Sequence, residues 1–336
     1  MLTHLPRNHY EAVCEFLKRI RADEIFSMAR SKCGRDPTYE EFIRSIIIPE
    51  NISPNEEAQA SNYANIYFHM YHMLESRDRL YYVTPNLAAK LAQTSLNIDS
   101  YFIRSPFREI FVQIDPGMFF IKDIDGSRVS VNGFYVYLKD FDSYKQLRIM
   151  ACSLLKPIPE IHFNDSTFYF RFDIGPGKVM EQVKKIVAKY KKDPDELDKF
   201  GAIKNIDYIE DFFSFVLNVL LYITSKKPDA QRQEMRLLTS KKKIRKLIKE
   251  GINTKRWITI CGSNIKDNNT DVEDIKNAGG IGAWKLMSRV KVSGHWRAQW
   301  YGSDKDGSKH TDIIWINDYE KGPEFADMVN SSYVVK

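Results

Sequence analysis

The chain has 336 residues, of which 43% are hydrophobic and 13% aromatic, and its formal net charge is +6. This composition can bury a substantial core and excludes a disordered protein. The four cysteines (Cys14, Cys33, Cys152 and Cys261) form no CxxC pair, so we expect neither a disulfide framework nor a metal site. The N-terminus lacks an apolar segment of signal-peptide length, and the most apolar run, 212–223, is too short to span a bilayer. We therefore expect a cytoplasmic protein with no membrane partner.

The N-terminal region is predicted to be helical. Apolar residues recur there at three- and four-residue steps, and acidic residues follow the expected helix starts. The expected helices cover residues 8–31, 36–47, 53–77 and 86–93. We treat residues 1–100 as a helical N-terminal region and residues 101–336 as an α+β core.

The middle of the chain changes to short aromatic and β-branched runs, which are typical of strands. These runs cover residues 109–114, 118–122, 129–139, 146–155 and 167–172. Turn formers such as Asp-Pro-Gly and Gly-Pro-Gly separate them. The short spacing favours an antiparallel sheet, because parallel strands need helical crossovers between them. Asn132-Gly133 fits either a hairpin turn or a bulge.

Helices are expected again over 178–192 and 208–223, and the second is apolar nearly all round. Such a helix is expected to be buried against the sheet. Residues 257–261 follow as a possible strand, and the tail 329–336 fits either an edge strand or a frayed end. The predicted fold class is α+β, with an N-terminal helical region, a central antiparallel β-sheet with packed helices and a C-terminal β-hairpin.

One segment, 236–256, carries the basicity of the chain. It holds nine Lys or Arg residues against one acid, Glu250, so its net charge is +8 and the rest of the chain sums to −2. The segment fits either a solvated helix face or an electrostatic contact with RNA or a ribosome. The residues expected to contact nucleic acid are Lys241, Lys242, Lys243, Arg245, Lys246 and Lys249.

The stretch 289–316 is predicted to form a β-hairpin. Val290 and Val292 alternate with polar residues, and Ile314 and Ile316 repeat the pattern after the polar run 303–308. Three of the five tryptophans of the chain fall in this stretch. They fit either a packed core or an amphipathic recognition surface, where Trp, Tyr and Arg are the usual anchors. Gly294 and Gly302 are expected to be required by the backbone beside bulky rings.

The order of these residues resembles a known family. The run Arg289…Gly294-His295-Trp296…Trp300-Tyr301-Gly302, followed by Ile-Trp-Ile, resembles the C-terminal signature of the second-described class of type V-A anti-CRISPR proteins, which occur on phages and plasmids. Two weaker similarities, 110–121 and 211–222, resemble the first strand pair and the central apolar helix of that family.

The resemblance implies a function against type V-A CRISPR immunity. It implies that the protein recognises the nascent N-terminal peptide of a type V-A CRISPR effector nuclease and lowers its production by promoting loss of its mRNA. The residues that we expect to hold the peptide are Arg289, Gly294, His295, Trp296, Arg297, Trp300, Tyr301, Gly302 and Trp315. The alternatives are an RNA- or ribosome-binding regulatory protein of a phage or plasmid with another target, and a structural interaction module.

The sequence contains no convincing catalytic or cofactor-binding pattern. Gly175-Pro-Gly-Lys178 lacks the first glycine and the Ser or Thr of a phosphate-binding loop. His69 and His72 lie one helical turn apart, and we expect them on a polar helix face rather than on a metal. His295 is the one candidate general base, but no acid or nucleophile can be assigned to it, so we expect no enzyme and no cofactor.

Overall fold

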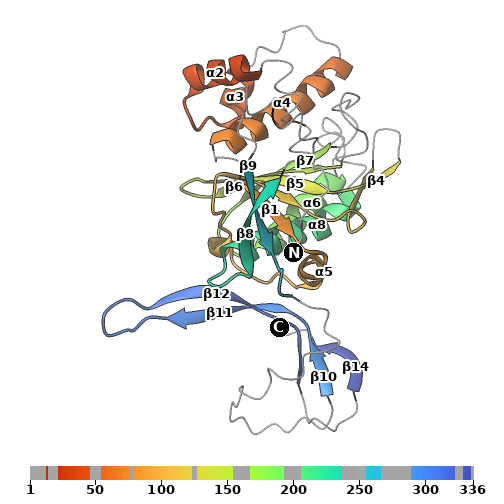
Figure 1. Ribbon diagram of the computed structural model, residues 1–336, viewed down its shortest axis with the longest axis vertical. Coiled ribbons are helices and arrows are strands. Elements are labelled where there is room, and N and C mark those ends of the chain that lie inside the picture. The colour runs from red at the N-terminus through yellow and green to blue at the C-terminus, as the bar shows by residue number, and fades with distance from the viewer. Residues whose placement is uncertain are drawn as a thin grey trace.

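The computed structural model has an α+β fold in which helices cover both faces of a seven-stranded sheet (Figure 1). A two-stranded hairpin projects from one end of this body, next to a small third sheet (Figure 1). The structure describes residues 13, 22–45, 54–75, 79–122, 127–153, 167–192, 206–236, 245, 255–265, 289–321 and 328–333. Within these residues, no helix combines the length and the apolar character that crossing a membrane requires.

Three N-terminal helices form one covering layer. They are α2 (Ala22–Cys33), α3 (Tyr39–Ser45) and α4 (Pro54–Glu75), and their buried rings pack on one sheet face. The start of α3 is set by a capping box, in which the Glu41 amide donates to Thr38 Oγ1 (3.2 Å) and the Thr38 amide donates to Glu41 Oε2 (2.8 Å). The first predicted helix, 8–31, lies largely outside the described residues before Ala22.

The central sheet is mixed, with the strand order β7-β6-β5-β2-β1-β9-β8. Its strands are β1 (Leu80–Val83), β2 (Glu109–Gln113), β5 (Gly133–Asp140), β6 (Lys145–Cys152), β7 (Thr167–Ile174), β8 (Ala230–Arg236) and β9 (Lys255–Cys261). The run β2-β5-β6-β7 is antiparallel, as predicted. Strand β1 was missed: it is parallel to both β2 and β9. The predicted fourth helix, α5 (Pro85–Gln93), lies in the crossover from β1 to β2, as a parallel pair requires.

A short hairpin of β3 (Phe120–Lys122) and β4 (Arg128–Ser130) precedes β5. The predicted strand 129–139 is therefore divided into β4 and β5. Gly133 is neither a turn nor a bulge, because it is the first residue of β5 and lies opposite Gln113 in β2. A Cβ at this position would lie 2.4 Å from the ring of Phe111, so the sheet face requires glycine there.

The other sheet face is covered by α5, α6 (Val179–Lys192) and α8 (Ile206–Thr224). A one-turn helix, η1 (Ser100–Phe102), lies in the connection from α5 to β2. Helix α8 is buried as predicted, and residues such as Phe213, Val216 and Leu217 have no exposed surface. The polar Asn218 of α8 is equally buried, so it needs hydrogen-bond partners inside the protein.

Five strands follow at the C-terminal end of the chain. Strands β10 (Arg289–Val292), β13 (Tyr319–Lys321) and β14 (Met328–Tyr333) form a three-stranded sheet. Strands β11 (His295–Tyr301) and β12 (His310–Ile316) form the projecting hairpin. The tail that fitted either an edge strand or a frayed end is therefore a strand over 328–333.

Candidate functional site

The projecting hairpin is formed by β11 and β12, which pair residue for residue over their whole length. Its first strand is β11, whereas the sequence analysis assigned the first strand to the segment around Val290 and Val292. Val290 and Val292 lie in β10 and pair with β13 and β14. Arg289 therefore lies in a different sheet from the other residues predicted to hold a peptide. The alternating pattern identified the strand correctly, but periodicity does not specify a strand's partner.

Trp296 attaches the hairpin to the body of the protein. Its indole Nε1 donates a hydrogen bond to Oδ1 of Asn218 in α8 (2.7 Å). The amide nitrogen of Asn218 donates to the carbonyl oxygens of Leu91 and Thr94 at the end of α5, both at 2.9 Å. One buried side chain thus joins the hairpin, α8 and α5.

Trp315 lies opposite Trp296 in the register and contributes to the same attachment. Its ring meets Tyr222 of α8 edge to face, with 5.7 Å between centroids, and lies 6.5 Å from the ring of Trp296. Ile313 is buried beside them and belongs to the main core. Two of the three hairpin tryptophans therefore pack against the body, as the core interpretation predicts.

The two glycines behave as the sequence analysis predicts. Gly302 has φ +79°, and a Cβ there would lie 2.3 Å from the backbone oxygen of Ser308. At Gly294 a Cβ would lie 2.9 Å from the ring of Trp315. Gly302 is thus needed for the turn and Gly294 for the close approach of the tryptophan.

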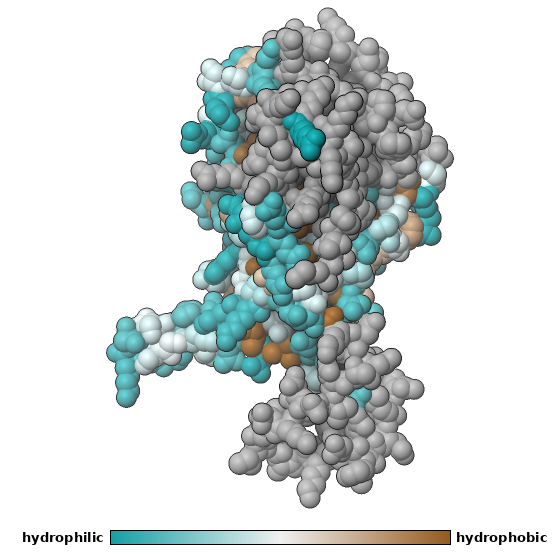
Figure 2. Space-filling model, viewed as in Figure 1, coloured by the Kyte–Doolittle hydropathy of each residue, from teal (hydrophilic) through white to brown (hydrophobic). Residues whose placement is uncertain are grey.

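The hairpin carries an exposed aromatic and cationic surface. Trp300 is 63% exposed, and the Lys309 ammonium lies 5.1 Å from the centroid of its ring. Arg297 is exposed and donates only to the neighbouring Gln299 (2.9 Å). Figure 2 shows hydrophobic residues gathered at the base of the hairpin and a hydrophilic far end. The exposed ring and cations thus extend from Arg297 near the base of the hairpin to Lys309 beside its turn.

A groove of about 500 Å³ begins at the base of the hairpin beside Trp315 and extends along it to Tyr301 at the far end of β11. The residues that matter for its chemistry are Tyr222, Lys226, Asn264, Tyr301, Ile314 and Trp315. The Lys226 ammonium lies 3.1 Å from the ring centroid of Tyr301 and 3.6 Å from Asp312 Oδ2. The groove thus combines apolar rings with cations, a polar amide and the carboxylate of Asp229, which also lines it.

The sequence analysis missed three residues of this groove. Tyr222 and Lys226 come from α8 and the segment after it, and Asn264 comes from the turn after β9. Asp229 orients Asn264 by accepting from its backbone amide (2.6 Å) and its side chain (2.8 Å). No local pattern marks these residues, because only the fold brings them to the hairpin.

His295 lies at the start of β11, and its Nδ1 is 3.0 Å from the carbonyl oxygen of Ser293. This contact with a backbone carbonyl is typical of a histidine at the end of a strand and gives it no catalytic partner. Within the described residues, no three or more His, Cys, Asp or Glu side chains are grouped so as to hold a metal ion. The absence of an enzymatic activity stays a prediction.

The two histidines of α4 are not on a polar face, so that prediction was wrong. His69 and His72 are both buried, and Nδ1 of His69 lies 3.1 Å from each carboxyl oxygen of Glu109 in β2. Burial lowers the pKa of His69, lowers the pKa of His72 to about 3 and raises the pKa of Glu109. The partner was not visible in the sequence because Glu109 is 40 residues away.

The basic segment forms the connection between the antiparallel strands β8 and β9, whose ends pair Arg236 with Lys255. Of the residues predicted to contact nucleic acid, Arg245 is described and exposed, and the others lie outside the described residues. At the base of this connection Trp257 is 46% exposed, and the Arg232 guanidinium lies 5.0 Å from its ring centroid. Nucleic-acid contact by this segment stays a prediction.

Comparison with known proteins identifies the family. The model of the Anti-CRISPR type V subtype A2 family (AcrVA2-like) matches residues 81–319, which is more than half of the chain. This chain belongs to that family. The match runs from β1 to β13, so it includes the hairpin, the groove and the basic connection.

The fold is similar to that of a solved protein, AcrVA2. The alignment with the crystal structure of AcrVA2 covers 93% of this chain and 99% of the solved chain. Its TM-score is 0.50 and the sequence identity is 11%. At this identity the likeness shows the fold alone. A search of the curated proteins finds no match.

Proposed function

We propose that this anti-CRISPR protein binds a short N-terminal peptide of a type V-A CRISPR effector as the peptide leaves the ribosome. Binding then lowers production of the effector by promoting loss of its mRNA, and the protein acts in the cytoplasm without being an enzyme. Membership of the AcrVA2-like family supports the target system. The observation that carries the peptide-binding step is the projecting hairpin with the groove at its base.

The hairpin is suited to accept an extended peptide. In the described part of the chain, its sheet consists of β11 and β12 alone, so each strand presents an outer edge of backbone donors and acceptors. An extended peptide adds to such an edge by main-chain hydrogen bonds, and pockets for its side chains supply specificity. Edge pairing explains how a nascent chain can be bound before it has folded.

The groove supplies the second part of the recognition. A side chain of an edge-bound peptide can enter it and contact Trp315, Tyr222 and Ile314. Lys226 offers a cation that already lies against Tyr301. Aromatic and cationic side chains in a desolvated groove are the usual anchors of an interface. We expect the preferred peptide to place an apolar or acidic side chain here.

Alanine at Trp300 or Arg297 is expected to weaken binding of a synthetic effector N-terminal peptide by about tenfold or more. Both side chains are exposed, so the melting temperature should stay within a few degrees. Fluorescence polarisation of the labelled peptide, with a scrambled peptide beside it, measures this. The matched control is Lys305→Ala at the hairpin tip. Unchanged binding in both variants, or equal binding of the scrambled peptide, would exclude the hairpin as the peptide site.

The second candidate function is that of an RNA- or ribosome-binding regulator with another target. The observation that favours it is the basic connection between β8 and β9, with the exposed Trp257 and Arg232 at its base. Exposed rings next to Lys and Arg are the parts from which single-stranded RNA sites are built. The same surface could also hold the protein at the ribosome while the hairpin reads the peptide.

Reversing the charge of Lys241, Lys242, Lys243, Arg245 and Lys246 is expected to abolish association with purified ribosomes at low salt. Wild-type binding should fall steeply with rising salt, because released counterions drive such an interaction. A salt titration of both proteins on ribosomes and on a generic RNA measures this, with peptide binding as the internal control. A flat salt response, or equal binding by both proteins, would contradict an electrostatic partner.

A further inference from the structure

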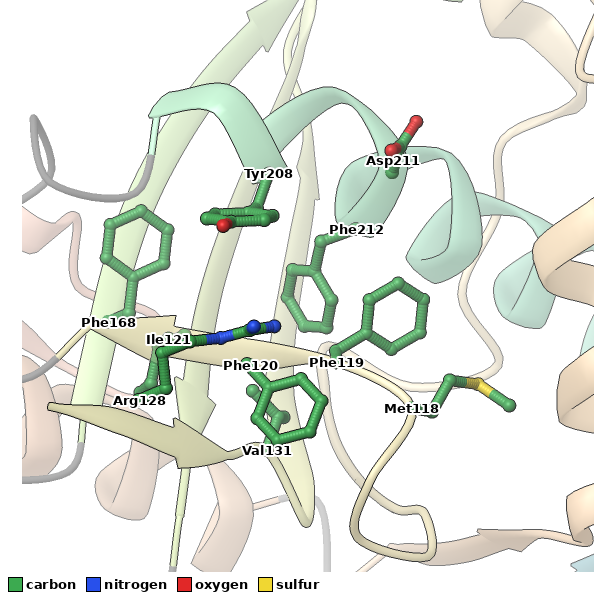
Figure 3. A pocket seen from close by; sticks show the side chains of 10 residues that line it. All are labelled: Met118, Phe119, Phe120, Ile121, Arg128, Val131, Phe168, Tyr208, Asp211 and Phe212. Carbon is green, nitrogen blue, oxygen red and sulfur yellow. The ribbon is translucent and has the colours of Figure 1, made fainter.

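A second concave site lies away from the hairpin. A cavity of about 250 Å³ is enclosed by the β3–β4 hairpin, the beginning of β7 and the first turn of α8. Figure 3 shows five aromatic side chains around it, namely Phe119, Phe120, Phe168, Tyr208 and Phe212. Phe119 and Phe212 meet edge to face at 5.3 Å, so the wall is packed rather than loosely gathered. Tyr208 remains 40% exposed at the mouth.

One cation is directed into this ring-lined space. The Arg128 guanidinium lies 4.5 Å from the centroid of Phe120, and Figure 3 shows it extending between Phe120 and Phe212. Among the described residues, Arg128 has no carboxylate within ion-pair distance. Asp211 also borders the cavity, but its carboxylate points away from the guanidinium (Figure 3). An arginine in an aromatic cavity with no anion of its own fits an anionic ligand.

We propose that this cavity binds an aromatic carboxylate. The ring would occupy the space between Phe168, Tyr208 and Phe212, and the carboxylate would accept hydrogen bonds from Arg128. A cavity of about 150 Å³ is sufficient for benzene, so the larger volume here can hold one ring with a short acid arm. The planar guanidinium matches the two oxygens of a carboxylate and repels an ammonium group. Asp211 at the border disfavours a second negative charge on the ligand.

The same chemistry has two possible sources. A small aromatic acid offers a ring and a carboxylate, and so does the C-terminal aromatic residue of a peptide. The cavity recognises both features through the same side chains, so the two sources differ only in what continues outside the mouth. A peptide would extend past the exposed Tyr208. A free acid would end inside the mouth.

Fluorine NMR of para-fluorophenylacetate added to the full chain tests the proposal. Saturable binding is expected with a dissociation constant on the order of 1 mM, as for a ligand of this size. Its charge-reversed analogue, para-fluorophenethylamine, should not bind. Arg128→Gln should weaken binding of the acid about tenfold or more, because it removes the charged partner. The matched control, Arg104→Gln, should bind the acid like the wild type, because Arg104 is an exposed arginine that lies over another ring, that of Tyr101 (5.2 Å).

A second variant and a second ligand complete the experiment. Arg128 and Tyr208 are both exposed, so Arg128→Gln and Tyr208→Ala should keep the wild-type melting temperature, and both should bind the acid less tightly. Gly-Gly-Phe with a free C-terminus, compared with its amide, tests the peptide source. Tighter binding of the tripeptide than of the free acid supports a peptide, and the reverse order supports a small aromatic acid. Absence of saturable binding, equal binding of the amine, or wild-type affinity in Arg128→Gln would overturn the proposal.

Discussion

Replacing Asn218 with leucine is expected to lower the melting temperature by roughly 5–10 °C and to loosen the hairpin. The side chain is fully buried and makes three hydrogen bonds, to Trp296, Leu91 and Thr94. Leucine fills a similar volume but leaves the indole N–H of Trp296 and the carbonyl oxygen of Thr94 without this partner, while the Leu91 carbonyl oxygen keeps the Thr94 amide as a donor (3.3 Å). Each unsatisfied group costs about 1–3 kcal/mol, and in a protein of this size 1 kcal/mol corresponds to about 2 °C.

Thermal unfolding followed by circular dichroism measures the loss, and hydrogen exchange at the end of α5 and in β11 locates it. Asn317→Leu is the matched control, because Asn317 is exposed and should tolerate leucine within a degree or two. Trp296→Phe should cost less than Asn218→Leu, since it breaks one of the three hydrogen bonds of Asn218 and keeps an aromatic ring against the core. If Asn218→Leu unfolds at the wild-type temperature with unchanged exchange in β11, the hairpin is held by the apolar contacts of Trp315 and Ile313 instead.

Asn218 also illustrates what a sequence can and cannot provide. One amide in an otherwise apolar helix indicates a buried hydrogen-bond partner, because such a group is rarely left unsatisfied. The identity of the partner is another matter, since Trp296 is 78 residues away and Leu91 is 127 residues away. Burial of α8 was therefore predictable from its apolar pattern, and the attachment of the hairpin to it was not.

Some strands could be predicted from the sequence and others could not. The antiparallel run β2-β5-β6-β7 followed from short runs separated by turn formers. Strand β1 was missed because four buried residues carry no alternating pattern. The first arm of the hairpin was assigned to β10 instead of β11, because Val290 and Val292 alternate with polar residues as a hairpin strand does. Periodicity indicates a strand, but long-range packing selects its neighbour.

Part of the candidate site could be predicted, namely the residues that form a cluster of aromatic and cationic side chains in the sequence. Arg297 and Trp300 stood out as an aromatic and cationic cluster, and both are exposed on the projecting hairpin. Tyr222 and Lys226 could not be predicted, because their part in the groove depends on where α8 ends relative to the hairpin. Arg128 could not be predicted either, because a single arginine in a short strand has no distinguishing pattern. Its place in a cavity lined by five aromatic rings depends on the fold.

The free energy of unfolding is expected to be greatest near pH 6.5. Buried His72 lowers it at more acidic pH, and the buried pair His69–Glu109 lowers it at more alkaline pH. His72 is neutral in the folded protein, where burial lowers its pKa from 6.5 to about 3. His69 and Glu109 form a buried pair in which the pKa of the acid is raised and the pKa of the imidazole is lowered. That pair holds one proton, whether it lies on the carboxyl or on the ring.

On the acid side the unfolded state binds more protons. Between pH 6.5 and 4.5 the unfolded His72 is charged while the folded one is not, and the unfolded His69–Glu109 pair carries one proton as in the folded state. Stability should therefore fall by about 1.4 kcal/mol for each pH unit below 6.5. Below 4.5 the unfolded Glu109 also takes up a proton, so the fall becomes steeper.

On the alkaline side the sign reverses. Above pH 6.5 the unfolded His69 is neutral and the unfolded Glu109 is ionised, so they hold no proton, while the folded pair still holds one. Stability is again expected to fall by about 1.4 kcal/mol per pH unit, until the folded pair loses its proton. The same buried layer thus limits stability in both directions.

Two variants separate the two sides of this profile. His72→Asn does not titrate and should remove the slope between pH 6.5 and 4.5. Glu109→Gln can still donate to His69, but its folding above pH 6.5 takes up no proton, so it should remove the alkaline slope. Below pH 6.5 the same variant should steepen the acid slope, because its buried His69 is neutral while the unfolded His69 is charged. Urea unfolding at a series of pH values measures both. A wild-type profile that is flat from pH 5 to 8, or an acid slope that survives in His72→Asn, would show that other groups control the stability. The acid and alkaline slopes share one physical origin, because the same loss of water lowers the pKa of a buried base and raises the pKa of a buried acid.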